Sequence, residues 1–191
     1  MERKFTTYQL AVTALMAAVM CILGPVSIFI GPIPVSLTNL VIFFAAYLLG
    51  AKLGTLSVLI YLLLGAVGLP VFSGYAGGVA KLAGPTGGFL IGFLAAAFFT
   101  GLFVDKFAAK PVFAALGMVL GDAAAYVLGV LWFMKVMPSD FMTAVTACVL
   151  PFLVWDAAKI VMASALGCVV RGRLVKAGLL KGVSPAAAEK K

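Results

Sequence analysis

The feature that most constrains this chain is a pair of charges inside one of its most apolar stretches, residues 150–159 (LPFLVWDAAK). Asp156 and Lys159 are three residues apart, so on a helix they project from one face about one turn apart. A charge at the centre of a bilayer costs roughly 2.5–3.5 kcal/mol, and two unpaired charges would cost about 5–7 kcal/mol. We therefore expect the pair either to face a functional pocket or to form an internal ion pair that holds helices together.

The composition places the chain in a membrane. Of its 191 residues, 64% are hydrophobic and 10% are charged, and the mean hydropathy is +1.22. No soluble domain of this length has such a composition. With segments of about 20 residues, the length allows roughly six transmembrane helices and no second domain. We expect an all-α membrane protein with a single domain over residues 1–191.

Several classes of site are excluded by what the sequence lacks. There is no histidine, which removes His-based metal sites and Ser–His or Cys–His catalysis. The three cysteines lie far apart without a CxxC pair, and we expect them to be packing residues. The glycine-rich GPTGG at residues 84–88 lacks the Gly-Lys-Ser/Thr ending of a nucleotide-binding loop. We expect no metal, no bound cofactor and no ATP site.

The predicted membrane helices are residues 6–24, 35–50, 54–69, 86–104, 111–134 and 152–170. Pro151 separates the last of them from a short helix predicted at the outer surface, residues 141–149. With six spans, both termini share one side, and that side collects eleven basic residues, including a basic tail over 171–191. The other side has only Lys81 and Lys135. The positive-inside rule then puts both termini in the cytoplasm. The net charge of +8 is a topology signal here, not a sign of nucleic-acid binding.

Two apolar connections interrupt the helices at the predicted outer surface. Residues 25–36 contain three prolines and a glycine, so they cannot sustain a lipid-exposed helix and are predicted to form a lid or a surface segment. Residues 70–85 contain four glycines but are too apolar for a solvated linker. We expect this second loop to pack onto the protein, with its glycines permitting close backbone approach.

Two polar groups near these loops are each open to two interpretations. Ser36, Thr38 and Asn39 stand at the start of a predicted helix, where they either cap it or donate to a ligand. Asp122 and Tyr126 lie one turn apart on another helix, and the aspartate must face protein or water and not lipid. It either bonds a neighbouring helix or contacts the ligand.

Small residues four apart mark faces where helices approach closely. The sequence predicts such faces at the glycine pairs 88/92 and 117/121. Ala14 and Ala18 form a third, on the first helix. This alanine face serves either packing within the monomer or docking of a partner protein.

A polar pair beneath two apolar, glycine-rich loops describes a pocket for a small, partly apolar molecule. An aspartate that accepts and a lysine that donates suit a ligand with N–H and C=O groups, or a carboxylate. Candidate apolar walls are the aromatic residues near the pair and in the second loop, and the loop glycines would let its backbone come close: Trp155, Phe72, Tyr75, Gly77 and Gly78. The residues alone do not name the ligand.

The sequence resembles the BioY family, the biotin-binding S components of energy-coupling factor (ECF) vitamin transporters. The resemblance covers nearly the whole chain and is most specific in GLPVFSGYAGG (residues 68–78), in GPTGGFLIGF (residues 84–93), and in the PF–x3–DxxK pattern that ends at Lys159. It implies high-affinity capture of biotin from outside the cell. Asp156 would accept from the N–H of the ureido ring and Lys159 would donate to its C=O, while residues 31–36 and 72–81 would close over the valerate tail.

The resemblance also implies partners. An S component of this kind associates with a transmembrane coupling protein and two ATP-binding-cassette ATPases in the bacterial cytoplasmic membrane, which would explain the missing ATP site. Small-xxx-small motifs in the first helix dock the coupling protein across S components, so Ala14 and Ala18 would do so here. Release inwards would involve toppling of the whole subunit.

Two positions depart from the family pattern. Thr38 stands where glutamine is common, and Phe89 stands where tyrosine is common, which removes one hydroxyl. Three other functions compete with biotin capture. The first is an S component for a different vitamin, which competition between biotin and other vitamins would reveal. The second is a membrane-embedded enzyme that uses Asp122, Asp156 and Lys159 as acid–base groups, which turnover of biotin would reveal. The third is a structural subunit or channel, which would conduct ions across a bilayer without saturable binding of a vitamin.

Overall fold

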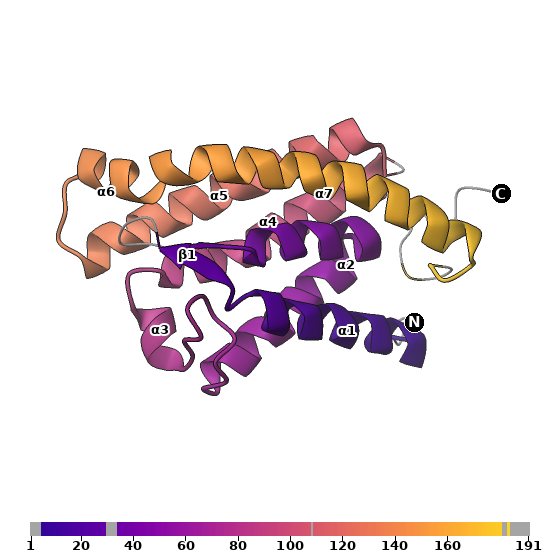
Figure 1. Cartoon of the computed structure of the whole chain (residues 1–191), viewed down its shortest axis with the longest axis horizontal. Helices are drawn as coiled ribbons and strands as arrows, with labels where there is room; N and C mark the ends of the chain where they lie inside the picture. Colours follow the sequence, from indigo (N-terminus) through magenta and orange to yellow (C-terminus); the bar gives the residue numbers. More distant parts are fainter. Residues whose placement is uncertain (1–4, 30–33, 108, 181–182, 184–191) are drawn as a thin grey trace.

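The computed structural model describes residues 5–29, 34–107, 109–180 and 183. It is a helical bundle with one small β-hairpin (Figure 1). In chain order the elements are α1 (Thr7–Leu23), β1 (Ser27–Phe29), β2 (Pro34–Ser36), α2 (Thr38–Ala66), α3 (Val79–Ala83), α4 (Gly87–Lys106), α5 (Pro111–Val136), α6 (Phe141–Cys148) and α7 (Leu150–Lys176).

The long helix α2 folds back on itself at Gly50. This glycine has φ 79° and ψ −175°, outside the helical region. A Cβ on Gly54 would come within 2.8 Å of the Ala46 Cα, whereas eight residues of continuous helix rise about 12 Å. α2 is therefore two packed segments, residues 38–49 and 51–66, which confirms the two predicted helices there. The predicted start at residue 35 was wrong, because residues 34–36 pair with β1 as a strand.

Four helical stretches are long and apolar enough to cross a membrane: α2, α4, α5 and the stretch Phe141–Lys176 that joins α6 to α7. α1 is a shorter apolar helix of 17 residues. Because α2 contributes two segments, six apolar helical segments lie where the sequence predicted six. The hairpin of β1 and β2 was not predicted; its three-residue strands are too short to show an alternating pattern.

The predicted division of the last apolar stretch into a short and a long helix is confirmed, because α6 ends at Cys148 and α7 begins at Leu150. The break lies at Val149, with φ −120° and ψ −55°, and Pro151 sits in the first turn of α7, where its missing N–H costs nothing. α7 then continues to Lys176, so the predicted basic tail from residue 171 is helical at its start. Arg171 is buried. Its Nη1 donates to the carbonyl oxygens of Tyr47 at 2.5 Å and Leu48 at 3.0 Å.

Small residues allow α4 and α5 to pack closely, as predicted. A Cβ added to Gly92 would lie 2.7 Å from the Ala125 Cα, and one added to Gly121 would lie 2.7 Å from the Ala96 Cα. No larger side chain fits at either glycine without moving the partner backbone. This tight pair positions the first turns of α4 beside the second half of α5.

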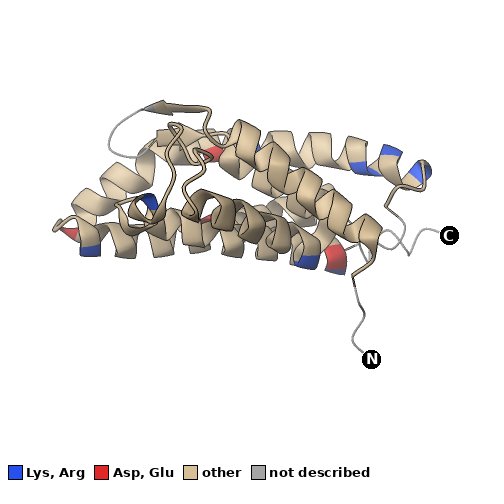
Figure 2. Ribbon diagram, turned by 90° about the horizontal axis from the view of Figure 1, so that it is seen from below, with Lys and Arg blue, Asp and Glu red and all other residues tan. Residues whose placement is uncertain are grey.

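The two ends of the bundle differ in charge. Both termini lie at one end, and α3, α6 and the hairpin lie at the other (Figure 1). Figure 2 shows basic residues gathered towards the end with the termini. The described ones on the turns and helix ends there are Lys52, Lys106, Lys110, Arg171, Arg173 and Lys176, against Lys81 and Lys135 at the other end. The charge separation predicted between two sides of the protein is therefore present in space.

Candidate functional site

A cavity opens at the end of the bundle away from the termini, between β2 and the helices α2, α4, α5 and α7. Its space, including the open mouth, is about 450 Å³. Apolar and polar residues share its walls: Pro34, Ser36, Asn39, Phe89, Phe93, Asp122, Ala125, Tyr126, Phe152, Asp156 and Lys159.

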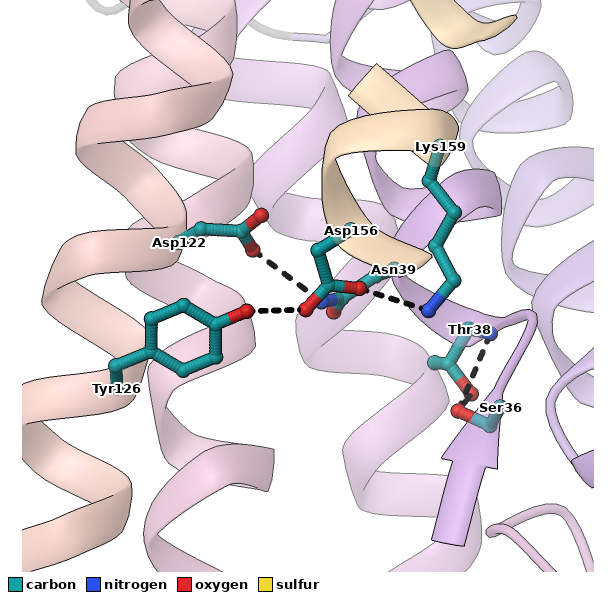
Figure 3. A network of polar contacts seen from close by, with 7 residues as sticks. All are labelled: Ser36, Thr38, Asn39, Asp122, Tyr126, Asp156 and Lys159. Atoms are coloured by element: carbon teal, nitrogen blue, oxygen red, sulfur yellow. Dashed lines mark hydrogen bonds and ion pairs between the residues drawn. The ribbon is translucent and has the colours of Figure 1, made fainter. Parts of the chain in front are cut away.

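The charged pair of α7 forms one wall. Lys159 Nζ lies 2.8 Å from Asp156 Oδ1, and the two side chains are only 9% and 5% exposed. Tyr126 on α5 donates its hydroxyl to Asp156 Oδ2 at 2.5 Å, so each carboxylate oxygen has a donor (Figure 3). The sequence left open an ion pair or a pocket, and the structure contains both. Asp156 is the one hydrogen-bond partner of Lys159 among the described residues, so the ammonium keeps donors for a ligand.

A second polar pair joins α2 to α5 in the same cavity. Asn39 Nδ2 donates to Asp122 Oδ1 at 3.2 Å (Figure 3). Asn39 Oδ1 and Asp122 Oδ2 are buried and have no hydrogen-bond partner among the described residues. A buried polar atom without a partner costs about 1–3 kcal/mol. Asp122 thus makes the predicted bond between helices, and its second oxygen, in a residue that lines the cavity, is left without a partner among the described residues.

The hydroxyls of Ser36 and Thr38, at the start of α2, have different roles. Ser36 Oγ donates to Thr38 Oγ1 at 2.9 Å, and Thr38 Oγ1 donates to the Gly24 carbonyl at 3.3 Å. Thr38 is 1% exposed and does not line the main cavity. It therefore fixes the chain at the start of α2, whereas Ser36 lines the cavity.

The structure does not bring the predicted aromatic walls to this cavity. Trp155 is 47% exposed, because it lies about 100° around the helix from Asp156. Phe72 is fully buried against Tyr61, with ring centroids 5.5 Å apart. Tyr75 is 70% exposed. Gly77 and Gly78 are also absent from the cavity walls.

Three phenylalanines that the prediction left out form the apolar walls instead: Phe89, Phe93 and Phe152. Helical spacing could have found them. Phe89 and Phe93 are four residues apart at the start of α4, and Phe152 precedes Asp156 by four on α7. Residues four apart share one face of a helix, so Phe152 lies on the same side as the charged pair.

The loop after α2 packs onto the protein, as predicted. Gly74 N donates to the Pro25 carbonyl at 3.1 Å, and Gly78 N donates to the Gly65 carbonyl at 2.7 Å. Gly78 has φ 87°, a backbone angle that favours glycine. The loop includes α3, where partial burial lowers the pKa of Lys81. Of the other predicted lid, residues 31–33 lie outside the described part.

A second cavity adjoins the first, with a space of about 340 Å³ including its open mouth. The two have four wall residues in common: Pro34, Ser36, Phe89 and Phe93. The remaining walls are Thr38, Tyr61, Ser73, Thr86 and Leu90. The site therefore has a charged compartment and a neutral compartment side by side.

Ala14 and Ala18 lie on the outer face of α1. Both are exposed, whereas Thr13, Ala17 and Met20 face the core. Packing within the monomer therefore does not explain the two alanines, and docking of a partner stays a prediction.

Comparison with known proteins agrees with this architecture. The model of the BioY family matches residues 1–176. A biotin transporter BioY of Thermotoga maritima is 39% identical over 156 residues, which cover 82% of this chain and 91% of the relative. A probable biotin transporter BioY of Pyrococcus horikoshii is 37% identical over 151 residues, 79% of this chain and 88% of the relative.

One solved structure is also similar over almost the whole chain. It is described as the S-component for biotin from an ECF-type ABC transporter, and it matches with a TM-score of 0.80 and 29% identity. The match covers 90% of this chain and 95% of that one. Together with the apolar spans, these similarities establish that this multi-pass membrane protein belongs to the BioY family.

Proposed function

We propose that this protein is the biotin-binding S component of an ECF-type transporter in the bacterial cytoplasmic membrane, and that it is not an enzyme. The observation that carries the proposal is the buried Asp156–Lys159 pair on the wall of a cavity, in a chain of a family whose members are described as biotin transporters.

The polar groups of the charged compartment match a ureido ring. Such a ring presents two N–H donors and one carbonyl acceptor. Asp156 accepts from one N–H and Lys159 donates to the carbonyl. The unpartnered oxygens of Asn39 and Asp122 accept from the other N–H, and the ligand thereby satisfies atoms that are otherwise buried without a partner. Phe89, Phe93 and Phe152 supply the apolar walls.

Uptake needs partners and an energy source beyond this chain. The GPTGG stretch lacks the ending of a nucleotide-binding loop, so ATP hydrolysis belongs to two associated ATPases, and a transmembrane coupling protein docks on the exposed Ala14 and Ala18 of α1. The basic end of the bundle carries both termini and faces the cytoplasm by the positive-inside rule. The cavity then opens outwards, and the whole of residues 1–191 acts as one transmembrane domain without a resident cofactor.

Titration calorimetry of the purified protein in detergent tests the proposal. We expect one-to-one binding of biotin, and at least a tenfold loss of affinity, or about 1.4 kcal/mol, in Asp156→Asn and in Lys159→Met. Asp140→Asn and Lys135→Met make the same chemical changes at exposed positions away from the cavity and should bind as the parent does. If the folded parent fails to bind biotin, the proposal is wrong and other vitamins become the candidates. Loss of affinity in the two control variants would mean that the Asp156 and Lys159 effects do not report on the site.

A further inference from the structure

The neutral compartment lies against the amino end of α4. Thr86, the residue just before α4, and Phe89, Leu90 and Phe93 in its first two turns all line it. In Figure 3, Ser36 and Thr38, which also line it, lie on the lysine side of the Asp156 carboxylate, away from Tyr126. A ligand held at Asp156 and Lys159 can therefore extend past the shared walls into this compartment.

One buried hydroxyl in this compartment has no partner among the described residues. Thr86 Oγ1 is buried without a hydrogen bond, in a residue that is 9% exposed. The neighbouring hydroxyls of Thr38 and Tyr61 are engaged, with the carbonyls of Gly24 at 3.3 Å and Val71 at 3.1 Å. Leaving a buried hydroxyl without a partner is unfavourable, so the Thr86 hydroxyl is a group that a ligand would satisfy. The half-buried Ser73 also lines the compartment, and its hydroxyl makes no hydrogen bond to the described residues.

The backbone around Thr86 explains why its hydroxyl is free. Threonine before a helix usually adopts an extended conformation and caps the first turn with its side chain. Thr86 instead has φ −91° and ψ −2° and makes no such capping bond. The segment just before α4 is held in place by α5, because Trp132 Nε1 on α5 donates to the Gly84 carbonyl at 3.0 Å.

Helix polarity at this position favours an anion. α4 has 20 residues, and the amino end of a helix carries a partial positive charge that attracts carboxylates. The described walls of the compartment contain hydroxyl and apolar side chains but neither lysine nor arginine. An anion here would be held by a hydroxyl and the helix end, not by an ion pair.

We infer that the neutral compartment binds the carboxylate at the end of the ligand's aliphatic chain, through the Thr86 hydroxyl and the amino end of α4. This inference rests on the proposed function, since it takes biotin as the ligand and the charged compartment as the place of its ureido ring. It divides recognition in two: α7 and α5 bind the ring, and Thr86 with α4 bind the chain end.

The test compares biotin with its neutral primary amide, which keeps the ring and the chain but lacks the charge. Calorimetry on the full-length protein would use the parent, Thr86→Val, Thr86→Ser and Thr100→Val. The last is a matched control, because Thr100 is a second buried hydroxyl of α4 without a partner and lines neither cavity. We expect the parent to prefer biotin to the amide by about tenfold. Thr86→Val should lose about tenfold in affinity for biotin and little for the amide, while Thr86→Ser and Thr100→Val should behave as the parent does.

The other outcomes distinguish failure of this inference from failure of the proposed function. Equal binding of biotin and amide by the parent overturns the inference and leaves the proposed function standing. The same holds if Thr86→Val lowers the affinity for biotin and for the amide by the same factor, because Thr86 would then have only a structural role. A parent that binds neither ligand overturns the proposed function, and the inference with it. If Thr86→Val does not fold, the preference of the parent and the behaviour of Thr86→Ser still decide.

Discussion

The two ends of the bundle differ in how their buried charged groups are satisfied. At the end with the termini, the buried and half-buried charged side chains bond the backbone, although the buried hydroxyls of Thr55 and Thr100 have no partner among the described residues. Arg171 donates to two carbonyls of α2, Asp105 Oδ2 accepts from Ala51 N at 2.9 Å, and the Tyr47 hydroxyl donates to the Ala109 carbonyl at 2.7 Å. At the cavity end, Asn39, Asp122 and Thr86 each keep a buried atom without a partner among the described residues.

This difference separates stability from binding. The break in α2 at Gly50 leaves carbonyls and N–H groups without helical partners, and side chains from α4 and α7 satisfy them at the closed end. The open end instead has buried polar atoms without partners among the described residues, at a cost to the protein, and under the proposed function biotin would satisfy them. Substitutions at the closed end should therefore act on stability, and those at the open end on affinity.

Arg171→Leu should have the largest effect on stability. It removes two hydrogen bonds from a charged donor and leaves the Tyr47 and Leu48 carbonyls buried without it, which we expect to cost about 3 kcal/mol. The measurement is the midpoint of thermal unfolding in detergent. Arg173→Leu is the matched control, because Arg173 is exposed two residues further along α7, and its midpoint should stay near that of the parent. Equal midpoints for the two variants would show that the closed end is not held by Arg171.

Gly50→Ala should have the next largest effect. Its φ of 79° strains any residue with a Cβ by about 1–2 kcal/mol, and the added carbon would meet the Asp105 carboxylate, with Cγ at 2.8 Å. We expect a loss of about 2 kcal/mol in the free energy of unfolding, part of it from displacing Asp105 from Ala51 N. Gly172→Ala should instead be neutral or stabilising, because nothing lies within 4 Å of that Cβ and alanine favours a helix. A neutral Gly50→Ala would mean that α2 is not broken there.

Asp122→Asn should spare stability and weaken binding. The amide keeps the size of the side chain and an oxygen for the Asn39 bond, but turns the unpartnered acceptor of this cavity-lining residue into a donor. Without biotin we expect the midpoint of unfolding to be equal or higher. The rise of the midpoint with biotin should shrink, since ligand stabilisation follows affinity, and we expect about a tenfold weaker Kd. Asp140→Asn, at an exposed aspartate, should leave both quantities unchanged. A marked loss of stability in the ligand-free Asp122→Asn protein would contradict the division between the ends.

The sequence predicted the elements of this site better than its shape. The free-energy cost of placing charges in a bilayer, together with helical spacing, identified Asp156 and Lys159. The apolar, glycine-rich loop was also correctly expected to pack onto the protein. Arg171 was missed as a buried residue, because its partners are carbonyls that become free only when α2 breaks at Gly50. Thr86 was counted as part of a helix start, since its unusual backbone angles have no signature in the residue types. Contacts between distant elements, which hydropathy does not encode, decided both cases.

The aromatic walls show the same limit and give the smallest expected effect. Trp155 and Phe152 lie within one turn of each other on α7, but Phe152 is 8% exposed on the cavity wall and Trp155 is 47% exposed. We expect Trp155→Leu to change biotin affinity by less than about twofold, or about 0.4 kcal/mol, because the side chain points away from the site. Phe152→Leu, the same kind of change one turn earlier, should weaken binding by about fivefold through lost apolar contact. Calorimetry on both variants decides which face of α7 belongs to the site: a loss confined to Trp155→Leu would mean that this helix is rotated about its axis when biotin is bound.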